Sequence, residues 1–286
     1  MADTLALRRR IKTAQNISKT TRAMQMIAAS KLKKAQHAAL ASRPYTDELI
    51  TLASHLAGNK VDTDDSHPYL GKKERTGKTL YIFIGPDKGL CGGMVTNLLK
   101  EYMTAKKDDK ASFVAIGKKM EGPIAGGKKL VGSFHFGTSL PAFEQVYPVI
   151  EIITQQYLQG DIDAVKIVST EFISVFAQTP KIIDLLPVQL DPKEAESISA
   201  ETLFEPTTGE LLPELLRRYI ETVIYQQFLE SYASYNGAQM IAMQNATNNA
   251  KDIVSDLQLL YNKARQEKIT KEILDISSAA VALGSK

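Results

Sequence analysis

Apolar and small residues recur at both ends of the chain with the spacing of a coiled coil. The mean step is about 3.5 residues, which predicts two helices with a left-handed supercoil. The seam positions are Leu7, Ile11, Ala14, Ile17, Thr21, Met24, Ala28, Leu32 and Ala35 in the first stretch, and Met240, Met243, Thr247, Ala250, Val254, Leu257, Tyr261 and Ala264 in the second. Each stripe alone also fits an ordinary helical-bundle core. Two such stripes at opposite ends of one chain favour an antiparallel pair.

Helix-breaking residues are concentrated between these two stretches. All 11 prolines lie from Pro44 to Pro213, and no glycine precedes Gly58. Proline breaks helix interiors and glycine weakens them. We therefore expect two uninterrupted helices, one from about Leu5 to Leu56 and one from about Leu211 to Leu283.

The expected lengths of these helices constrain the architecture. At 1.5 Å per residue the first spans roughly 80 Å and the second roughly 110 Å, so neither fits inside a compact domain of this size. The second helix should extend beyond its partner by about 30 Å. Its last segment, residues 273–283, is small, smooth and nearly uncharged. We expect another protein to cover the apolar face of that segment.

The middle of the chain has the pattern of an α/β domain. Short apolar runs predict buried strands, and helical stretches lie between some of them, which is typical of βαβ units with a largely parallel, Rossmann-like sheet. The expected strands are 80–84, 113–116, 130–136, 165–169 and 182–190, with helices at 94–106 and 142–158. The predicted division is a discontinuous antiparallel coiled coil (1–57 and 210–286), an inserted α/β domain (76–192) and connecting segments (58–75 and 193–209).

Charge is distributed unevenly along a chain whose net charge is only +3. Residues 1–43 hold ten Lys or Arg side chains and one acid, whereas residues 214–286 are balanced. A basic arm indicates a charged partner: nucleic acid, a membrane surface or an acidic protein. Residues 1–43 contain no aromatic residue, and the apolar side chains among them are mostly Ala, Met and Ile. This composition favours an acidic protein sleeve, and a nucleic-acid-binding coiled coil remains the alternative.

The sequence predicts neither a membrane span nor a secretory signal. No run reaches 18 apolar residues, and the N-terminal charges do not precede an apolar run. The arginine-rich start resembles a mitochondrial presequence, but the same pattern continues into a long helix, which disfavours that interpretation. Cys91 is the only cysteine, so no internal disulfide forms, as fits a reducing compartment.

A glycine-rich loop at 85–93 follows an expected strand and precedes an expected helix, where phosphate-binding loops lie. Its spacing matches neither the Walker nor the dinucleotide fingerprint. We therefore expect a tight turn formed by Gly89, Cys91, Gly92 and Gly93, and a nucleotide-binding enzyme remains the alternative. Cys91 has no histidine nearby in sequence to act as a base, and the four histidines lack metal-ligand spacing. No catalytic residue, metal or cofactor is expected.

Several long segments, in order along the chain, resemble the gamma-subunit family of F-type ATP synthases, in its bacterial form. They are residues 9–36, 41–45, 67–70, 87–93, 240–250 and 257–273. The resemblance implies the central rotor stalk of a proton-translocating ATP synthase, a non-catalytic subunit with no cofactor. It would couple rotation of a membrane ring of c subunits to conformational change at catalytic sites in an alpha/beta hexamer. The implied partners are the alpha, beta and epsilon subunits and the c ring, with no nucleic acid and no direct small-molecule substrate. The implied location is peripheral, on the cytoplasmic face of the bacterial inner membrane.

The resemblance also implies roles for particular residues. Contact with the hexamer falls to Lys19, Arg22, Met24, Arg265, Gln266 and Thr270. A bearing tip comprises Ile276, Ala279, Ala280, Val281 and Leu283. The foot that meets epsilon and the c ring includes Phe204, Glu205 and Pro206.

The sequence departs from the family pattern just before Met240. Tyr235 and Gln239 stand where the family usually has an acid and an arginine, and Asn236-Gly237 is unusual inside a helix. We expect that turn to be locally weaker. The paired-cysteine insertion of chloroplast members is missing, so thiol regulation is not expected.

Overall fold

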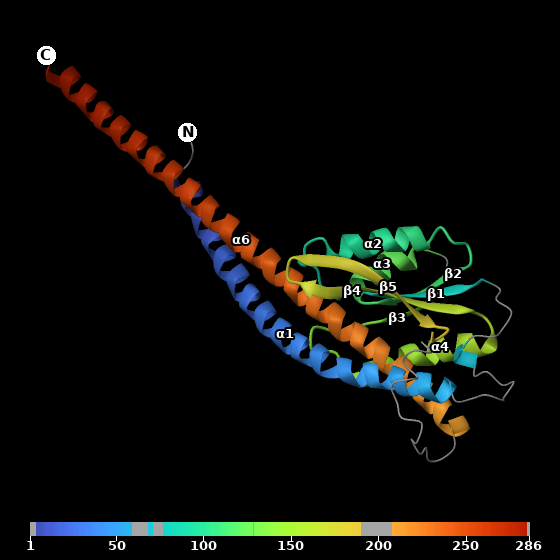
Figure 1. The fold of residues 1–286 in the computed structure, drawn as a ribbon. Coiled ribbons are helices and arrows are strands. Elements are labelled where there is room, and N and C mark those ends of the chain that lie inside the picture. Colours follow the sequence, from blue (N-terminus) through green and yellow to red (C-terminus); the bar gives the residue numbers. More distant parts are fainter. Residues whose placement is uncertain (1–3, 59–67, 71–76, 128, 190–207, 285–286) are drawn as a thin grey trace. The chain divides into compact units, whose positions relative to one another are not determined.

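Two long helices formed by the ends of the chain dominate the computed structural model, which describes residues 4–58, 68–70, 77–127, 129–189 and 208–284 (Figure 1). Helix α1 spans Thr4–Gly58 and helix α6 spans Thr208–Gly284, which are 55 and 77 residues. The expected pair of long helices with an inserted α/β region is confirmed.

The chain forms two compact units, each of which contains part of both helices. The two-helix unit comprises residues 1–27 and 240–286. The α/β unit comprises residues 28–239 and therefore also includes the C-terminal part of α1 and the N-terminal part of α6.

The expectation of proline-free helices is wrong at Pro213, which lies inside α6, and at Pro44, which lies inside α1. Proline has no N–H, so the carbonyl of Leu40 loses its helical hydrogen-bond donor. Leu40 is 62% exposed and Pro44 is also exposed, so water can satisfy that carbonyl. Helix α1 therefore continues for another 14 residues beyond Pro44, where packing stabilises it.

The α/β unit contains a five-stranded sheet with the order β3-β2-β1-β4-β5. The strands are β1 (Thr79–Ile84), β2 (Ala111–Ile116), β3 (Leu130–Phe134), β4 (Ala164–Ser174) and β5 (Ala177–Leu186). The helices of the region are η1 (Pro68–Leu70), α2 (Met94–Ala105), α3 (Lys118–Ala125), η2 (Phe143–Val146) and α4 (Tyr147–Gln159). Strands β1 to β4 pair in parallel, so the expected largely parallel sheet is confirmed.

Two details of this region differ from the sequence prediction. Helix α3 was not expected, because Gly122 and Pro123 lie within its eight residues. Strand β5 pairs antiparallel with β4 and begins at Ala177, five residues earlier than predicted. Strands β4 and β5 form a hairpin, and the residues near its turn include many polar ones. No continuous apolar run therefore indicated a strand there.

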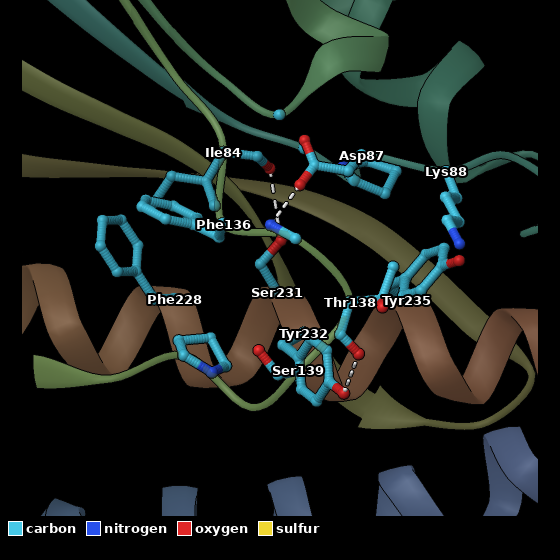
Figure 2. A pocket seen from close by; sticks show the side chains of 15 residues that line it. Ile84, Asp87, Lys88, Phe136, Thr138, Ser139, Phe228, Ser231, Tyr232 and Tyr235 are labelled. Atoms are coloured by element: carbon cyan, nitrogen blue, oxygen red, sulfur yellow. Dashed lines mark hydrogen bonds between the residues drawn. The ribbon is translucent and has the colours of Figure 1, made fainter. Parts of the chain in front are cut away.

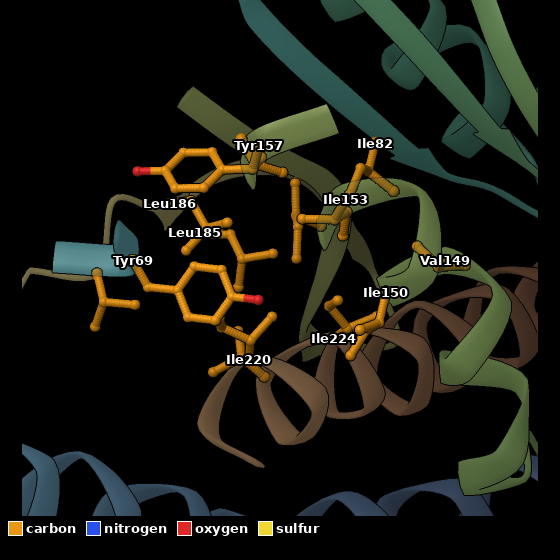
Figure 3. Packing of buried hydrophobic residues seen from close by; sticks show 14 of the residues in the cluster. Tyr69, Ile82, Val149, Ile150, Ile153, Tyr157, Leu185, Leu186, Ile220 and Ile224 are labelled. Atoms are coloured by element: carbon orange, nitrogen blue, oxygen red, sulfur yellow. The ribbon is translucent and has the colours of Figure 1, made fainter. Parts of the chain in front are cut away.

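Both faces of the sheet are covered, which explains the apolar runs in the central strands. Along β1, Leu80, Ile82 and Ile84 face one core while Phe83 faces the other. The first core contains residues of α4 and α6, including Ile153 and Ile224, together with Tyr69 of η1 (Figure 3). The second core lies between the sheet and helices α2 and α3. The N-terminal part of α6 therefore acts as a structural layer of the α/β unit.

Candidate functional site

The seam of the two-helix unit is built from small and medium-sized side chains. Ala14, Met243 and Ala250 are buried, and the Thr21 and Thr247 hydroxyls lie 2.7 Å apart across the helix pair. Threonine hydroxyls at facing positions require the two backbones to approach closely. The predicted seam is therefore present, and the Thr21–Thr247 contact fixes its antiparallel register.

The predicted seam includes one incorrect position, Ile17. This side chain is 49% exposed, and Ser18 is half-buried in its place. The inward positions of α1 are Leu7, Ile11, Ala14, Ser18 and Thr21, with steps of four and three residues. An apolar residue next to the true seam position misled the sequence assignment.

The residues implied to contact an alpha/beta hexamer fall at two levels of the two-helix unit. Lys19 and Arg22 are exposed and Met24 is half-buried, all near the Thr21–Thr247 contact. Arg265, Gln266 and Thr270 are exposed on α6. Arg265 lies 18 residues beyond Thr247, which is about 27 Å at 1.5 Å per residue. The structure does not bring the two groups together, so they would contact a surrounding protein at separate places.

Helix α6 extends past the beginning of its partner. Tyr261 and Ala264 are its last half-buried residues, and every side chain from residue 265 to 278 is exposed. Four of these are large and apolar: Ile269, Ile273, Leu274 and Ile276, between 46% and 71% exposed. Contiguous exposed apolar side chains on a helix are typical of a surface that another protein covers. The expectation of an unpaired end is confirmed for these residues.

Part of the implied tip and all of the implied foot lie outside what the structure describes. Ala279, Ala280, Val281 and Leu283 belong to helix α6, but their side chains are not described. The segment Phe204, Glu205 and Pro206 lies outside the described residues.

The glycine-rich loop after β1 is organised by Asp87. One carboxylate oxygen accepts a hydrogen bond from the Lys118 backbone N–H at 2.9 Å, at the start of α3, and the other accepts from the Gly137 N–H. His135 Nδ1 lies 3.6 Å from the same carboxylate. A helix N-terminus attracts anions. Here the anion at the start of α3 is the chain's own Asp87 carboxylate. That side chain is only 9% exposed.

Two glycines outside the predicted set allow the loop to approach its neighbours. A Cβ on Gly117, which has φ +93°, would lie 2.2 Å from the Gly85 carbonyl oxygen. A Cβ on Gly85 would lie 2.4 Å from Met120 Cγ. Within the predicted set, Gly92 has a positive φ of 59°, while Gly93 has φ −82°. The loop therefore depends on glycine most strongly where it crosses to β2 and α3.

Cys91 lies in this loop but has the character of a core residue. It is 2% exposed and packs among the side chains between the sheet and α2. Burial raises the pKa of its thiol above the ordinary value of 9.0. A reactive cysteine needs a lowered pKa and an accessible sulfur. The geometry of Cys91 therefore does not suit it to act as a nucleophile.

The place where parallel sheets usually bind ligands, beyond the carboxyl ends of the strands, is occupied by helix α6 (Figure 2). Ser231 donates a hydrogen bond to the Ile84 carbonyl at 3.3 Å, and Tyr232 and Tyr235 line the same space. The remaining cavity has a volume of about 40 Å³, room for a few water molecules at most. Pockets for small molecules are several times larger.

Tyr235 and Gln239, the two departures from the family pattern, are neighbours on α6. Burial raises the pKa of Tyr235 from 10.0 to about 12, and a hydrogen bond to the Gln239 side chain opposes the shift. Gly237 faces the β4–β5 hairpin, since a Cβ there would lie 3.3 Å from the Phe172 ring. The absence of a side chain at Gly237 thus lets this hairpin pack closely on α6.

Neither a metal site nor a membrane-spanning helix is present in the part of the chain that the structure describes. No group of three or more His, Cys, Asp or Glu side chains in it is placed to hold a metal ion. None of its helices combines the length and the apolar character needed to cross a membrane.

Comparisons with known proteins agree with one another. The family model described as ATP synthase matches residues 4–283. The ATP synthase gamma chain of Dehalococcoides mccartyi is 38% identical over 289 residues, covering 99% of this chain and 100% of that one. The corresponding protein of Coxiella burnetii is 36% identical over 291 residues, with the same coverage.

Solved structures show the same fold at low sequence identity. A chain of the Euglena gracilis mitochondrial ATP synthase matches with a TM-score of 0.69 and 17% identity, covering 98% of this chain and 94% of that one. A chain from the central stalk and c ring of the Tetrahymena thermophila mitochondrial ATP synthase gives a TM-score of 0.61 and 20% identity, covering 79% of this chain and 99% of that one.

Proposed function

The chain belongs to the ATP synthase gamma chain family, whose members are the non-catalytic central-stalk subunit of the rotor, and from that premise we propose how it works. The paired α1 and α6 helices form a shaft that turns inside a hexamer of alpha and beta subunits. Its rotation couples proton flow through a membrane ring of c subunits to ATP synthesis or hydrolysis in the hexamer.

The observation that carries this proposal is the unpaired end of α6. Residues 265–278 are all exposed in the isolated chain yet include four large apolar side chains. A protein sleeve would bury them. A turning contact requires few directional bonds, because each broken hydrogen bond adds a barrier of about 1 kcal/mol. The four large apolar side chains are aliphatic and form no directional bonds, which suits a bearing.

We assign the polar contacts with the hexamer to two levels of the shaft. Arg265, Gln266 and Thr270 form the outer level, where the arginine can make charge-assisted hydrogen bonds to a loop of beta. Lys19 and Arg22, with Met24 beside them, form the inner level. Because these levels are about 30 Å apart along the shaft, they would engage different parts of the beta subunits.

The remaining assignments concern the foot and the tip of the rotor. We assign contact with the epsilon subunit and the c ring to a foot that includes Phe204, Glu205 and Pro206. Ile276 begins the bearing tip, which continues through Ala279, Ala280, Val281 and Leu283. The complex would place this chain peripherally on the cytoplasmic face of a bacterial inner membrane.

Co-expression with alpha, beta and epsilon subunits tests the assembly directly. We expect a stable complex that hydrolyses ATP and rotates this chain, observed with a bead attached to the α/β unit. Removal of residues 276–286 should lower the torque while leaving residual hydrolysis. Failure of the full chain to enter an alpha/beta hexamer, or full rotation after charged substitutions throughout the α6 seam, would overturn the proposal.

A further inference from the structure

The short segment that connects β3 to η2 contacts several other elements of the α/β unit. We define the strap as residues 136–141, which run from Phe136 to Pro141 (Figure 2). It touches the loop after β1 on one side and the two long helices on the other. No sequence motif indicates any of these contacts.

The Thr138 carbonyl oxygen is the point where both long helices meet the strap. The Tyr232 hydroxyl of α6 donates a hydrogen bond to this oxygen at 3.1 Å, and the Lys31 ammonium of α1 donates a second. A carbonyl oxygen has two lone pairs and can accept both. One backbone atom therefore joins α1, α6 and the α/β region.

Further contacts fix the strap along its length. The Phe136 and Phe228 rings pack with centroids 4.3 Å apart, and the Tyr225 hydroxyl reaches the Pro141 carbonyl at 3.4 Å. On the sheet side, the Gly137 N–H donates to Asp87. Asp87 in turn holds the start of α3, so the strap connects the helices to the sheet through a buried carboxylate.

We propose that the strap is the torsional joint of the rotor, with Lys31 and Tyr232 as its positioning residues. This inference rests on the proposed rotary function. Torque that passes between the α/β region and the two helices needs a connection that resists rotation, and van der Waals packing alone is weakly directional. Hydrogen bonds to a single fixed carbonyl are directional, so they hold both helices at one angle to the sheet.

Two substitutions remove the donors while keeping the packing. Tyr232→Phe deletes only the hydroxyl, and Lys31→Met keeps the length of the side chain without the ammonium group. The matched controls are Tyr45→Phe and Lys33→Met, at exposed positions of α1. All variants are assembled with alpha and beta subunits, and the complete complex is measured.

The first measurement is hydrogen exchange at the Gly137 amide. Each single variant should exchange about fivefold faster there, since loss of a net hydrogen bond of about 1 kcal/mol raises the opening equilibrium by that factor. Amides of α2 should not change. The controls should match the wild type.

The second measurement distinguishes a torsional joint from a merely structural contact. A bead is attached at Phe176→Cys, on the 79% exposed hairpin tip, and its angular spread is recorded while the complex waits for ATP. We expect a broader spread for both variants than for the wild type and controls.

The outcomes separate this inference from the rotary function itself. A wild-type bead that does not turn contradicts the rotary function. A bead that turns, with the same angular spread in all variants, overturns the joint. If Lys31→Met fails to assemble, Tyr232→Phe decides, because it loses a single oxygen atom.

Discussion

The two-helix unit and the α/β unit use the same pair of helices in different ways. In the two-helix unit the helices meet through small side chains, with the Thr21–Thr247 hydroxyl contact at their seam. In the α/β unit the same helices are joined by polar side chains. Arg43 pairs with the buried Glu230 at 3.1 Å, and Gln226 bonds both to Glu230 and to the Ala39 carbonyl.

The contacts of α6 with the sheet show the same difference between the two units. Helix α6 is bonded to it through Ser234 to the Thr170 carbonyl at 3.1 Å and through Ser169 to Gln227 at 2.8 Å. Beyond Ala264 the same helix presents only exposed side chains as far as residue 278. Helix α6 is therefore held by several directional bonds to the sheet and to α1 in the α/β unit, whereas from residue 265 to 278 its side chains are exposed.

The largest expected effect comes from the core of the α/β unit. Phe228 is 1% exposed and packs on Phe136, so Phe228→Ala should lower the free energy of unfolding by about 3–5 kcal/mol. Leu259→Ala, at a 67% exposed position of the two-helix unit, should change it by less than about 0.5 kcal/mol. Urea unfolding of both variants measures the contrast, and equal losses would contradict it.

A backbone substitution should have the next largest effect. Gly117→Ala combines a positive φ with a clash against the Gly85 carbonyl, so we expect a loss of about 2–3 kcal/mol. The control is Gly160→Ala, where φ is +79° and nothing lies within 4 Å of the added Cβ. That variant should lose only about 1 kcal/mol. Thermal unfolding of the pair isolates the contribution of the close approach.

Alkaline pH should weaken the α/β unit through Tyr235. Because burial raises its pKa to about 12 from 10.0, the folded state keeps the phenol proton that the unfolded chain loses. The stabilisation is complete below pH 10 and is lost as pH rises toward 12, and it amounts to about 2 kcal/mol. Tyr235→Phe should show a shallower fall in stability over that window. A parallel fall in both proteins would exclude Tyr235 as the cause.

The smallest expected effect lies at the seam of the two-helix unit. Thr21→Val removes one hydroxyl, but the Thr247 hydroxyl keeps its bond to the Met243 carbonyl at 2.7 Å. The cost should therefore be about 0.5 kcal/mol or less. Chemical denaturation of the isolated chain, with Thr247→Val and the double variant completing the cycle, measures it. A coupling above about 1.5 kcal/mol would mean that this contact is as directional as those of the α/β unit.

Local sequence patterns predicted the helices and strands better than the tertiary contacts between them. The coiled-coil period located both long helices, and the apolar runs located the five strands. The expectation of helices without proline failed at Pro44, where α1 continues because the lost hydrogen bond falls on an exposed face. Helix α3 was missed because Gly122 and Pro123 are poor helix formers, while packing of Met120 and Ile124 into the core holds them in place.

Of the interaction surfaces, the apolar end of α6 was predictable and the strap was not. The excess length of α6 and the nearly uncharged sequence of residues 273–283 already indicated an unpaired end. Asp87 was visible only as part of a glycine-rich loop. The partner of Lys31 and Tyr232 is a backbone carbonyl, which leaves no trace in the identity of the residue at position 138.

The sequence by itself determined the two helices, their register of small residues, the α/β character of the middle and the family. Those properties depend on neighbours within a few turns or strands, where spacing and residue type suffice. Tertiary structure decided that α6 fills the ligand position of the sheet, that Asp87 occupies the start of α3, and that one carbonyl joins both helices. Such contacts link residues far apart in sequence, 107 positions in the Lys31–Thr138 bond and 147 in the Ser231–Ile84 bond, and only the folded chain brings those atoms together.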